Sequence, residues 1–185
     1  MMIQNNFLPP NCYGGKITPS GLIVHYFSCI NVDPDNPYDI DNCRVLFEDL
    51  NLDEKDRTKY KDIGSKERLY ASAHLLIGRE NDCIKLVPEN KKAYHAGVSY
   101  YKGLKNWNKF SLGVELVGSE DSGFTDFQYN ALAWYTQMCM AKYGFSFDMV
   151  AGHETIAPDR KYDPGISTGN FDWARFEKAC TYSID

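Results

Sequence analysis

The feature that most limits the fold is the alternation of short apolar runs with segments of helical pattern. Residues 22–27 and 110–118 are apolar runs with the length and composition of buried strands. Residues 125–128 have the form of a capping box, and the helix they open is predicted to run to about Tyr143, before Gly144. Strands and helices mixed along one chain predict the α/β class, built around a single central sheet.

Residues 1–20 form a polar, turn-rich stretch. After this stretch, further strands and helices are predicted. Residues 70–77 and 83–87 are predicted to form two strands joined by a polar turn. A partial helical stripe near residues 40–50 predicts a helix between two loops. Asp172 is suited to cap a final helix. The residues of that helix predicted to face the core are Trp173, Phe176 and Cys180.

The helix that begins near residue 125 carries one apolar face. Its apolar residues recur at helical spacing, which is the pattern of core packing and not of a cofactor site. We therefore expect this face to cover the sheet. The residues predicted to pack inward are Phe127, Ala131, Trp134, Tyr135 and Met138.

Length and charge narrow the class of protein. The 185 residues are predicted to form one domain, 1–185, which is large enough to bury its own core; that core is expected from about residue 21 to about residue 180. The net charge of −5 argues against nucleic-acid binding and, more weakly, against binding to anionic membranes. Because the start has no basic and apolar leader pattern and no run is long enough to cross a bilayer, the expected location is the cytoplasm.

The six cysteines are scattered along the chain without a C-x-x-C pair. Neither a zinc knuckle nor a dithiol redox motif is therefore indicated. Their even number permits disulfides. In a chain of this size without a secretion signal, however, reduced and mostly buried thiols are the expected state.

The segment 150–165 brings together three polar side chains, those of His153, Lys161 and Asp163. Prolines and a glycine in its second half predict an irregular loop that follows a short strand. An imidazole and a carboxylate are good ligands for zinc, and a nearby lysine adds positive charge without joining the coordination. The spacing matches no short zinc motif, however, so a surface loop of solvated charges is the competing interpretation.

Three apolar runs contain an ionisable residue. His25 lies near the end of the first run, where a lone histidine is more often a hydrogen-bonded core residue than a ligand. His74 interrupts another run, and a structural role within the sheet is at least as expected as a catalytic one. Glu115 must be paired, hydrogen-bonded or neutral if it is buried. In a cleft, burial would raise its pKa toward the range of a general base, whereas on an edge strand it would face water.

Four segments converge on one family. In chain order they read A-Y-H-A-G-V-S, S-L-G-V-E-L-V-G, G-H-E-T-I-A-P-D-R-K-Y-D-P-G and F-D-W-A-R-F. Together they resemble zinc-dependent N-acetylmuramoyl-L-alanine amidases of the amidase-2, peptidoglycan-recognition superfamily, and most of all the AmpD type. The resemblance extends from His25 to Phe176, and four ordered motifs are far more specific than any one of them.

The resemblance implies a fold and a metal site. The fold would be a single α/β domain with a central mixed β-sheet flanked by helices and a zinc cleft on one face. By this pattern His25, His153 and Asp163 would be the protein ligands of Zn²⁺. Water would occupy the fourth position, as an open catalytic zinc site requires.

The resemblance also implies a reaction. The family cleaves the amide between the lactyl group of N-acetylmuramic acid, or its anhydro form, and the L-alanine of the peptidoglycan stem peptide. Glu115 matches the catalytic glutamate, which accepts the proton of the attacking water and passes it to the leaving amine. Lys161 matches the catalytic lysine, which stabilises the developing oxyanion. His74 and His95 lie in family-like segments and are given a supporting or substrate-lining role.

Two segments depart from the family pattern. Residues 33–61 match no motif, and residues 166–170 lengthen the loop before F-D-W; both are expected to border the cleft. The loop K-G-L-K-N-W-N-K-F resembles amidases that act on intact cell wall at least as much as those restricted to anhydro-muropeptides. The resemblance therefore leaves the substrate preference open.

Two alternatives to a catalytic zinc site remain at this point. One is a module that binds muropeptides without cutting them, although such members of the superfamily typically lack a metal ligand. The other is a structural zinc with Cys29 as the nearest fourth ligand. In each case the expected partner is peptidoglycan or a muropeptide, with no nucleic acid and no membrane, and the expected state is a monomer. Release by a phage, or secretion without a classical signal, is the alternative to a cytoplasmic location.

Overall fold

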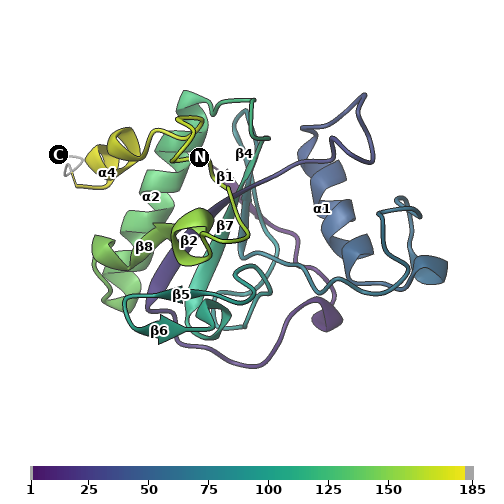
Figure 1. Cartoon of the computed structure of the whole chain (residues 1–185), viewed down its shortest axis with the longest axis horizontal. Coiled ribbons are helices and arrows are strands. Elements are labelled where there is room, and N and C mark those ends of the chain that lie inside the picture. The colour runs from purple at the N-terminus through teal and green to yellow at the C-terminus, as the bar shows by residue number, and fades with distance from the viewer. Residues whose placement is uncertain (1, 182–185) are drawn as a thin grey trace.

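The computed structural model describes residues 2–181. A sheet of six strands forms its centre (Figure 1). The strands are β1 (Met2–Asn5), β2 (Gly21–Phe27), β3 (Leu75–Ile77), β4 (Asp82–Lys85), β7 (Ser111–Val117) and β8 (Val150–Gly152). They lie in the order β1-β4-β3-β7-β2-β8. Because β3 and β4 are antiparallel and the other neighbours are parallel, the predicted α/β class with a mixed sheet is confirmed.

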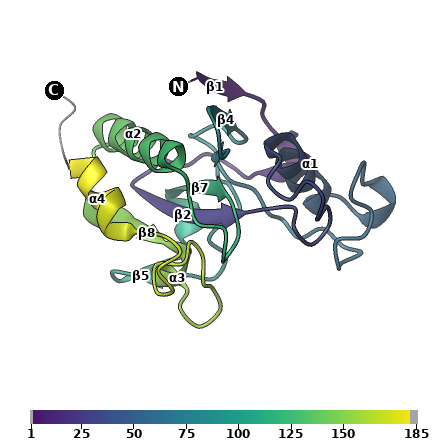
Figure 2. The same cartoon turned by 90° about the horizontal axis from the view of Figure 1, so that it is seen from above.

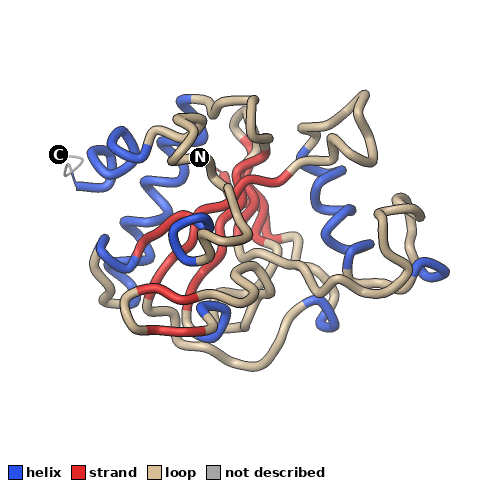
Figure 3. The backbone as a smooth tube through the Cα atoms, in the orientation of Figure 1, coloured by secondary structure: helices blue, strands red, loops and turns tan. Residues whose placement is uncertain are grey.

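Helices and a small hairpin surround the sheet (Figure 3). The α-helices are α1 (Ile40–Leu50), α2 (Asp126–Tyr143), α3 (His153–Ile156) and α4 (Trp173–Thr181). The hairpin consists of β5 (Tyr100–Tyr101) and β6 (Leu104–Lys105). Short 3-10 turns occupy Pro10–Cys12, Glu54–Asp56, Trp107–Lys109 and Phe147–Met149. Within residues 2–181, no helix has the length and apolar character needed to span a bilayer.

The sheet separates two hydrophobic layers. On one face it packs against α2 and α4, and on the other it packs against α1 (Figures 1 and 2). Successive side chains of a strand point to opposite faces, so Val24 and Leu116 belong to the first layer while Val117 belongs to the second. Residues 25 and 115 therefore point to the α1 side, where the apolar cover is incomplete near the ends of β2 and β7.

Helix α2 begins and ends as its sequence predicts. The hydroxyl of Thr125 accepts from the backbone N–H of Gln128, and the Gln128 side chain accepts from the backbone N–H of Thr125. The inward face is only partly as predicted, because Trp134 is 44% exposed. The buried face passes through Leu132 and Tyr135, and the large side chain of Trp134 projects away from it.

Helix α4 follows its prediction more closely. The carboxylate of Asp172 accepts from the backbone N–H of Arg175 and caps the helix. Phe176 and Cys180 are buried, whereas Trp173 is partly buried against Phe147. Packing of this short helix therefore depends mainly on Phe176.

The first strand was not predicted. β1 pairs in parallel with β4 at the edge of the sheet, where Gln4 and Asn5 are exposed. A strand of only four residues, two apolar and two polar, shows no alternating apolar pattern from which it can be recognised. The predicted strand at residues 70–77 is also shorter than expected, because only β3 at its end is regular.

The long segment between β2 and β3 is fixed to α1 by a buried carboxylate. Asp49 is fully buried, and it accepts hydrogen bonds from the N–H and hydroxyl of Thr58 and from the N–H groups of Lys59 and Tyr60, at 2.6–3.1 Å. Charge-assisted hydrogen bonds of this kind compensate for the loss of hydration of the anion. The loop that follows α1 is therefore held against the helix.

Candidate metal centre

Neighbouring strands bring His25 and Glu115 together. β2 and β7 run in parallel with His25 in register with Glu115, so both side chains project from the same face of the sheet. β8 pairs with the other side of β2 and ends at Gly152, immediately before His153. The site thus lies toward the carboxyl ends of parallel strands, where open α/β sheets commonly bind ligands.

His153 and Asp163 reach the same point from the segment that follows β8. His153 begins the short helix α3 instead of lying on a loop as predicted. The chain then returns, and the backbone N–H of Glu154 donates to the carbonyl of Asp163 at 2.8 Å. Asp163 Oδ2 lies 2.9 Å from His25 Nδ1 and 3.0 Å from His153 Nδ1, and the two Nδ1 atoms are 3.0 Å apart. Three potential ligand atoms therefore form one compact cluster.

The hydrogen bonds of the Nε2 atoms show which tautomer His25 and His153 adopt. His153 Nε2 lies 3.2 Å from the carbonyl oxygen of Ala96, so this nitrogen carries the proton and donates it. His95 Nε2 lies 3.3 Å from the carbonyl oxygen of Ser111 and must likewise donate. His95 Nδ1 is then an acceptor, and His25 Nε2, 3.0 Å away, must be its donor. In the imidazoles of both cluster histidines, Nδ1 is therefore left with its lone pair.

The cluster fits a divalent cation. Burial, with the neighbouring His153, lowers the pKa of His25 to about 4, so the imidazole of His25 is neutral at neutral pH. Two imidazole nitrogens and one carboxylate oxygen, clustered within reach of one ion, form a donor set that suits zinc.

Glu115 lies beside this cluster without a full set of partners. It is 7% exposed, and its Oε2 atom has no hydrogen-bond partner among residues 2–181. Burial, reinforced by the charge of Asp163 and opposed by that of Lys161, raises the pKa of Glu115 well above its usual range. A carboxyl group in this state is suited to exchange a proton with a bound molecule.

A cleft of about 390 Å³ opens over the cluster. It unites six of the seven predicted site residues, which are His25, His95, Glu115, His153, Lys161 and Asp163. The edge-strand interpretation of Glu115 is therefore wrong, because β7 lies inside the sheet and the side chain is buried. A solvated surface loop is likewise excluded for His153, which is 3% exposed.

His74 lies within the sheet and is not among the residues that line the cleft. Its imidazole is fully buried, accepts from the N–H of Gly113 through Nδ1 at 2.9 Å, and lies 2.9 Å from the carbonyl oxygen of Lys91 through Nε2. Both ring nitrogens are therefore used to join β7 to the loop near Lys91. His74 is a structural residue of the sheet and does not line the cleft.

Two other expectations about the surroundings of the cleft are corrected. Cys29 is not a fourth ligand, because its sulfur lies 3.7 Å from that of Cys43 in the core beside α1. The expected burial of the cysteines is confirmed. Of the two departing segments, residues 33–61 contribute Phe47 to the cleft, whereas residues 166–170 do not line it.

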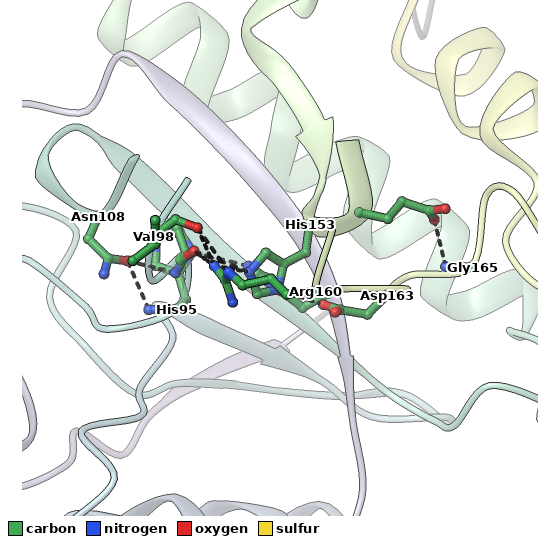
Figure 4. Close-up of polar contacts among 10 residues, drawn as sticks. His95, Val98, Asn108, His153, Arg160, Asp163 and Gly165 are labelled. Atoms are coloured by element: carbon green, nitrogen blue, oxygen red, sulfur yellow. Dashed lines mark hydrogen bonds and ion pairs between the residues drawn. The ribbon is translucent and has the colours of Figure 1, made fainter. Parts of the chain in front are cut away.

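Two charged residues that support the site were not predicted. The guanidinium of Arg160 donates to the carbonyl oxygens of Ala96 and Val98, and thereby holds residues 96–98 beside His153 (Figure 4). The carboxylate of Glu154 accepts from the N–H groups of Gly165, Ile166 and Ser167. Both lie inside the motif that contains His153 and Asp163, which is the only signal in the sequence for their roles.

Comparison with known proteins places this architecture in a family. The family model Amidase_2, described as N-acetylmuramoyl-L-alanine amidase, matches residues 16–166. The 1,6-anhydro-N-acetylmuramyl-L-alanine amidase AmpD of Enterobacter cloacae is 44% identical over 117 residues, or 63% of this chain and 61% of that protein. The match thus spans less than two thirds of that relative. AmpD of Escherichia coli strain K12 is 39% identical over 166 residues, or 90% of this chain and 85% of that protein.

A solved structure shows the same fold. The crystal structure of a selenomethionine AmpD derivative superposes with a TM-score of 0.77 at 34% sequence identity, covering 97% of this chain and 94% of that chain. The cluster of His25, His153 and Asp163 is a possible metal site of the His/His/Asp kind that is typical of the family.

Proposed function

This chain belongs to the Amidase_2 family of N-acetylmuramoyl-L-alanine amidases, and on this premise we propose that it is a zinc-dependent hydrolase of muropeptides. The bond cleaved is the amide between the lactyl group of 1,6-anhydro-N-acetylmuramic acid and the L-alanine of the stem peptide. One observation carries the proposal: three converging ligand atoms and a buried carboxyl oxygen without a hydrogen-bond partner among residues 2–181 line the same cleft.

His25, His153 and Asp163 would hold the zinc ion. Two imidazoles and one carboxylate are a common protein ligand set for catalytic zinc, and three protein ligands leave a further position open. When bound, the cation supplies Lewis-acid polarisation of the scissile carbonyl and makes water a nucleophile near neutral pH. With a cation held there, Glu115 would be favoured in its ionised form beside the carboxylate of Asp163.

Glu115 is the proposed general base and acid. It takes the proton of the attacking water at its carboxylate and then delivers this proton to the nitrogen of the leaving L-alanine. Its burial supports this role, because a raised pKa brings the carboxyl closer to the pKa that efficient proton transfer requires near neutral pH. Glu115 Oε2, which has no hydrogen-bond partner among residues 2–181, retains unused hydrogen-bonding capacity.

Lys161 is the proposed electrostatic partner of the developing oxyanion. Its side chain lines the cleft, and it lies two positions before the ligand Asp163 in the sequence. A cationic ammonium group in a partly desolvated cleft stabilises negative charge that appears only during the reaction, and such interactions raise the rate of the chemical step.

The soluble anhydro-muropeptide is the proposed substrate because the relatives named above are 1,6-anhydro-N-acetylmuramyl-L-alanine amidases. To test the proposal, purified protein is incubated with anhydro-N-acetylmuramyl-tripeptide, and the products are identified by mass spectrometry. We expect a free peptide that begins with L-alanine, and faster turnover of this substrate than of intact sacculi.

Two other outcomes are informative. If peptide is released faster from intact sacculi than from the anhydro-muropeptide, the proposed chemistry stands but the proposed substrate preference is wrong. If the zinc-loaded protein binds the muropeptide but releases no peptide, the proposed enzyme is wrong and a non-catalytic binding module is the remaining function.

A further inference from the structure

The imidazole of His95 lies directly behind His25, on the side opposite the three-atom cluster. Its Nδ1 atom is 3.0 Å from His25 Nε2, and the two rings are nearly perpendicular, at 85°. His95 is 8% exposed. A metal-binding histidine usually donates its second ring N–H to a carboxylate, a backbone carbonyl or water, and this contact orients the ligand. Here another imidazole occupies that position.

The orientation of His95 is itself fixed from several sides. Its Nε2 atom is bonded to the carbonyl oxygen of Ser111, and the side chain of Asn108 accepts from the backbone N–H groups of His95 and Ala96 (Figure 4). The ring rests on Gly113, where an added Cβ atom would lie only 2.4 Å from His95 Cγ. No other residue type than glycine leaves this space at position 113.

The hydrogen bonds of His95 give it one role. Because its Nε2 atom must donate to Ser111, its Nδ1 atom can only accept, and the donor is His25 Nε2. We propose that His95 is a positioning residue that selects the Nε2–H tautomer of His25 and so directs the Nδ1 lone pair toward the metal. The inference rests on the proposed function in one respect, which is that His25 binds a metal.

The competing tautomer explains why such a residue is needed. His25 Nδ1 lies 2.9 Å from Asp163 Oδ2, so a proton on Nδ1 would be bound by this carboxylate. In that state His25 Nδ1 presents no lone pair to a cation. The acceptor on His95 opposes this arrangement, because an unpaired buried nitrogen is costly. His153 has the equivalent support from the carbonyl oxygen of Ala96.

The experiment compares His95→Leu, which removes the acceptor, with His95→Asn, which places an amide oxygen close to the former Nδ1 position. Zinc affinity is measured by competition with a chromophoric chelator. We expect His95→Leu to bind zinc about 10- to 100-fold more weakly, and His95→Asn to stay within about threefold of the original protein. His74→Leu removes another buried imidazole, whose two ring nitrogens contact Gly113 and Lys91 and not a metal ligand, and it is expected to lower the melting temperature while zinc affinity is retained.

A second readout requires no substitution and no metal. Nitrogen NMR of the histidines in the metal-free protein should place the His25 proton on Nε2, and in His95→Leu the population should move toward Nδ1. The inference is overturned if folded His95→Leu binds zinc as tightly as the original protein, or if His25 of the original protein carries its proton on Nδ1. Absence of zinc binding by the original protein would instead refute the proposed function, and the tautomer would still be measured.

Discussion

Asp49 and Glu115 are both buried carboxylates, but their surroundings are opposite. Asp49 receives four hydrogen bonds from residues 58–60 and fastens a loop to α1. Glu115 lies in the cleft with Oε2 unpartnered within residues 2–181. The first region uses the carboxylate to make structure, whereas the second leaves hydrogen-bonding capacity unused. An incompletely satisfied buried carboxyl, placed beside a ligand cluster, is the sign of chemistry in this molecule.

The largest effect is expected from a substitution of Glu115, the carboxyl group in the cleft. Glu115→Gln retains the size and polarity of the side chain but cannot accept a proton, so turnover of the anhydro-muropeptide should fall by about 10²- to 10⁴-fold. Zinc content should be unchanged because Glu115 is not among the three clustered ligands. Turnover and metal analysis on the same sample test both statements, and turnover within tenfold of the original protein would remove Glu115 from the mechanism.

The structural side is tested by Asp49→Asn. The amide group turns part of the acceptor into a donor facing the N–H groups of residues 58–60, so we expect a loss of about 3 kcal/mol in the free energy of unfolding. Turnover per folded molecule should change by less than about twofold. Urea unfolding measures the free energy of unfolding, and an activity assay without urea measures the turnover. A large loss of turnover with normal stability would contradict the division between the two regions.

Glu89 is a third buried carboxylate, and its contribution to the stability of the fold depends on pH. Burial opposes ionisation of Glu89, but hydrogen bonds from Lys142, Lys85 and Tyr143 outweigh it and lower the pKa of Glu89 from 4.5 to about 2. A folded-state pKa below the unfolded value stabilises the fold above about pH 4.5, and this stabilisation is lost as the pH falls toward about 2.

Glu89→Gln isolates this contribution. In metal-free protein, the substitution should lower the free energy of unfolding by roughly 2 kcal/mol at pH 7, after allowance for the solvent screening of the half-exposed Lys142. The difference between the two proteins should shrink by pH 3. Equal differences at both pH values would show that the ion pairs of Glu89 contribute no pH-dependent stability.

Much of the fold could be predicted because its main elements carry local signals. The capping box of Thr125, the run around Val114 and the cap of α4 each specify an element within a few residues. β1 could not be predicted in this way, because its four residues carry no strand pattern of their own and become a strand by pairing with β4. Trp134 was placed on the wrong face because an apolar residue at helical spacing does not reveal the width of the buried face.

The site depends on contacts between residues far apart in the sequence. His25 and His153 are separated by 128 positions, and only the register of β2 with β7 and β8 brings their segments together. Local chemistry therefore left ligand and core roles open for His25, and the family resemblance supplied the ligand set. The same limit left His74 between a supporting and a substrate-lining role, because its partners at Lys91 and Gly113 lie on other elements.

The central claim is that His25, His153 and Asp163 hold one metal ion that the reaction requires. The most direct measurement is a titration of zinc into metal-free protein while anhydro-muropeptide turnover is followed, with Asp163→Ala as the matched variant. The account predicts that turnover is absent without metal, rises linearly and reaches its plateau at about one equivalent of zinc, since one three-ligand cluster binds one ion. Full turnover by the metal-free protein, or an unchanged titration of Asp163→Ala, would contradict it.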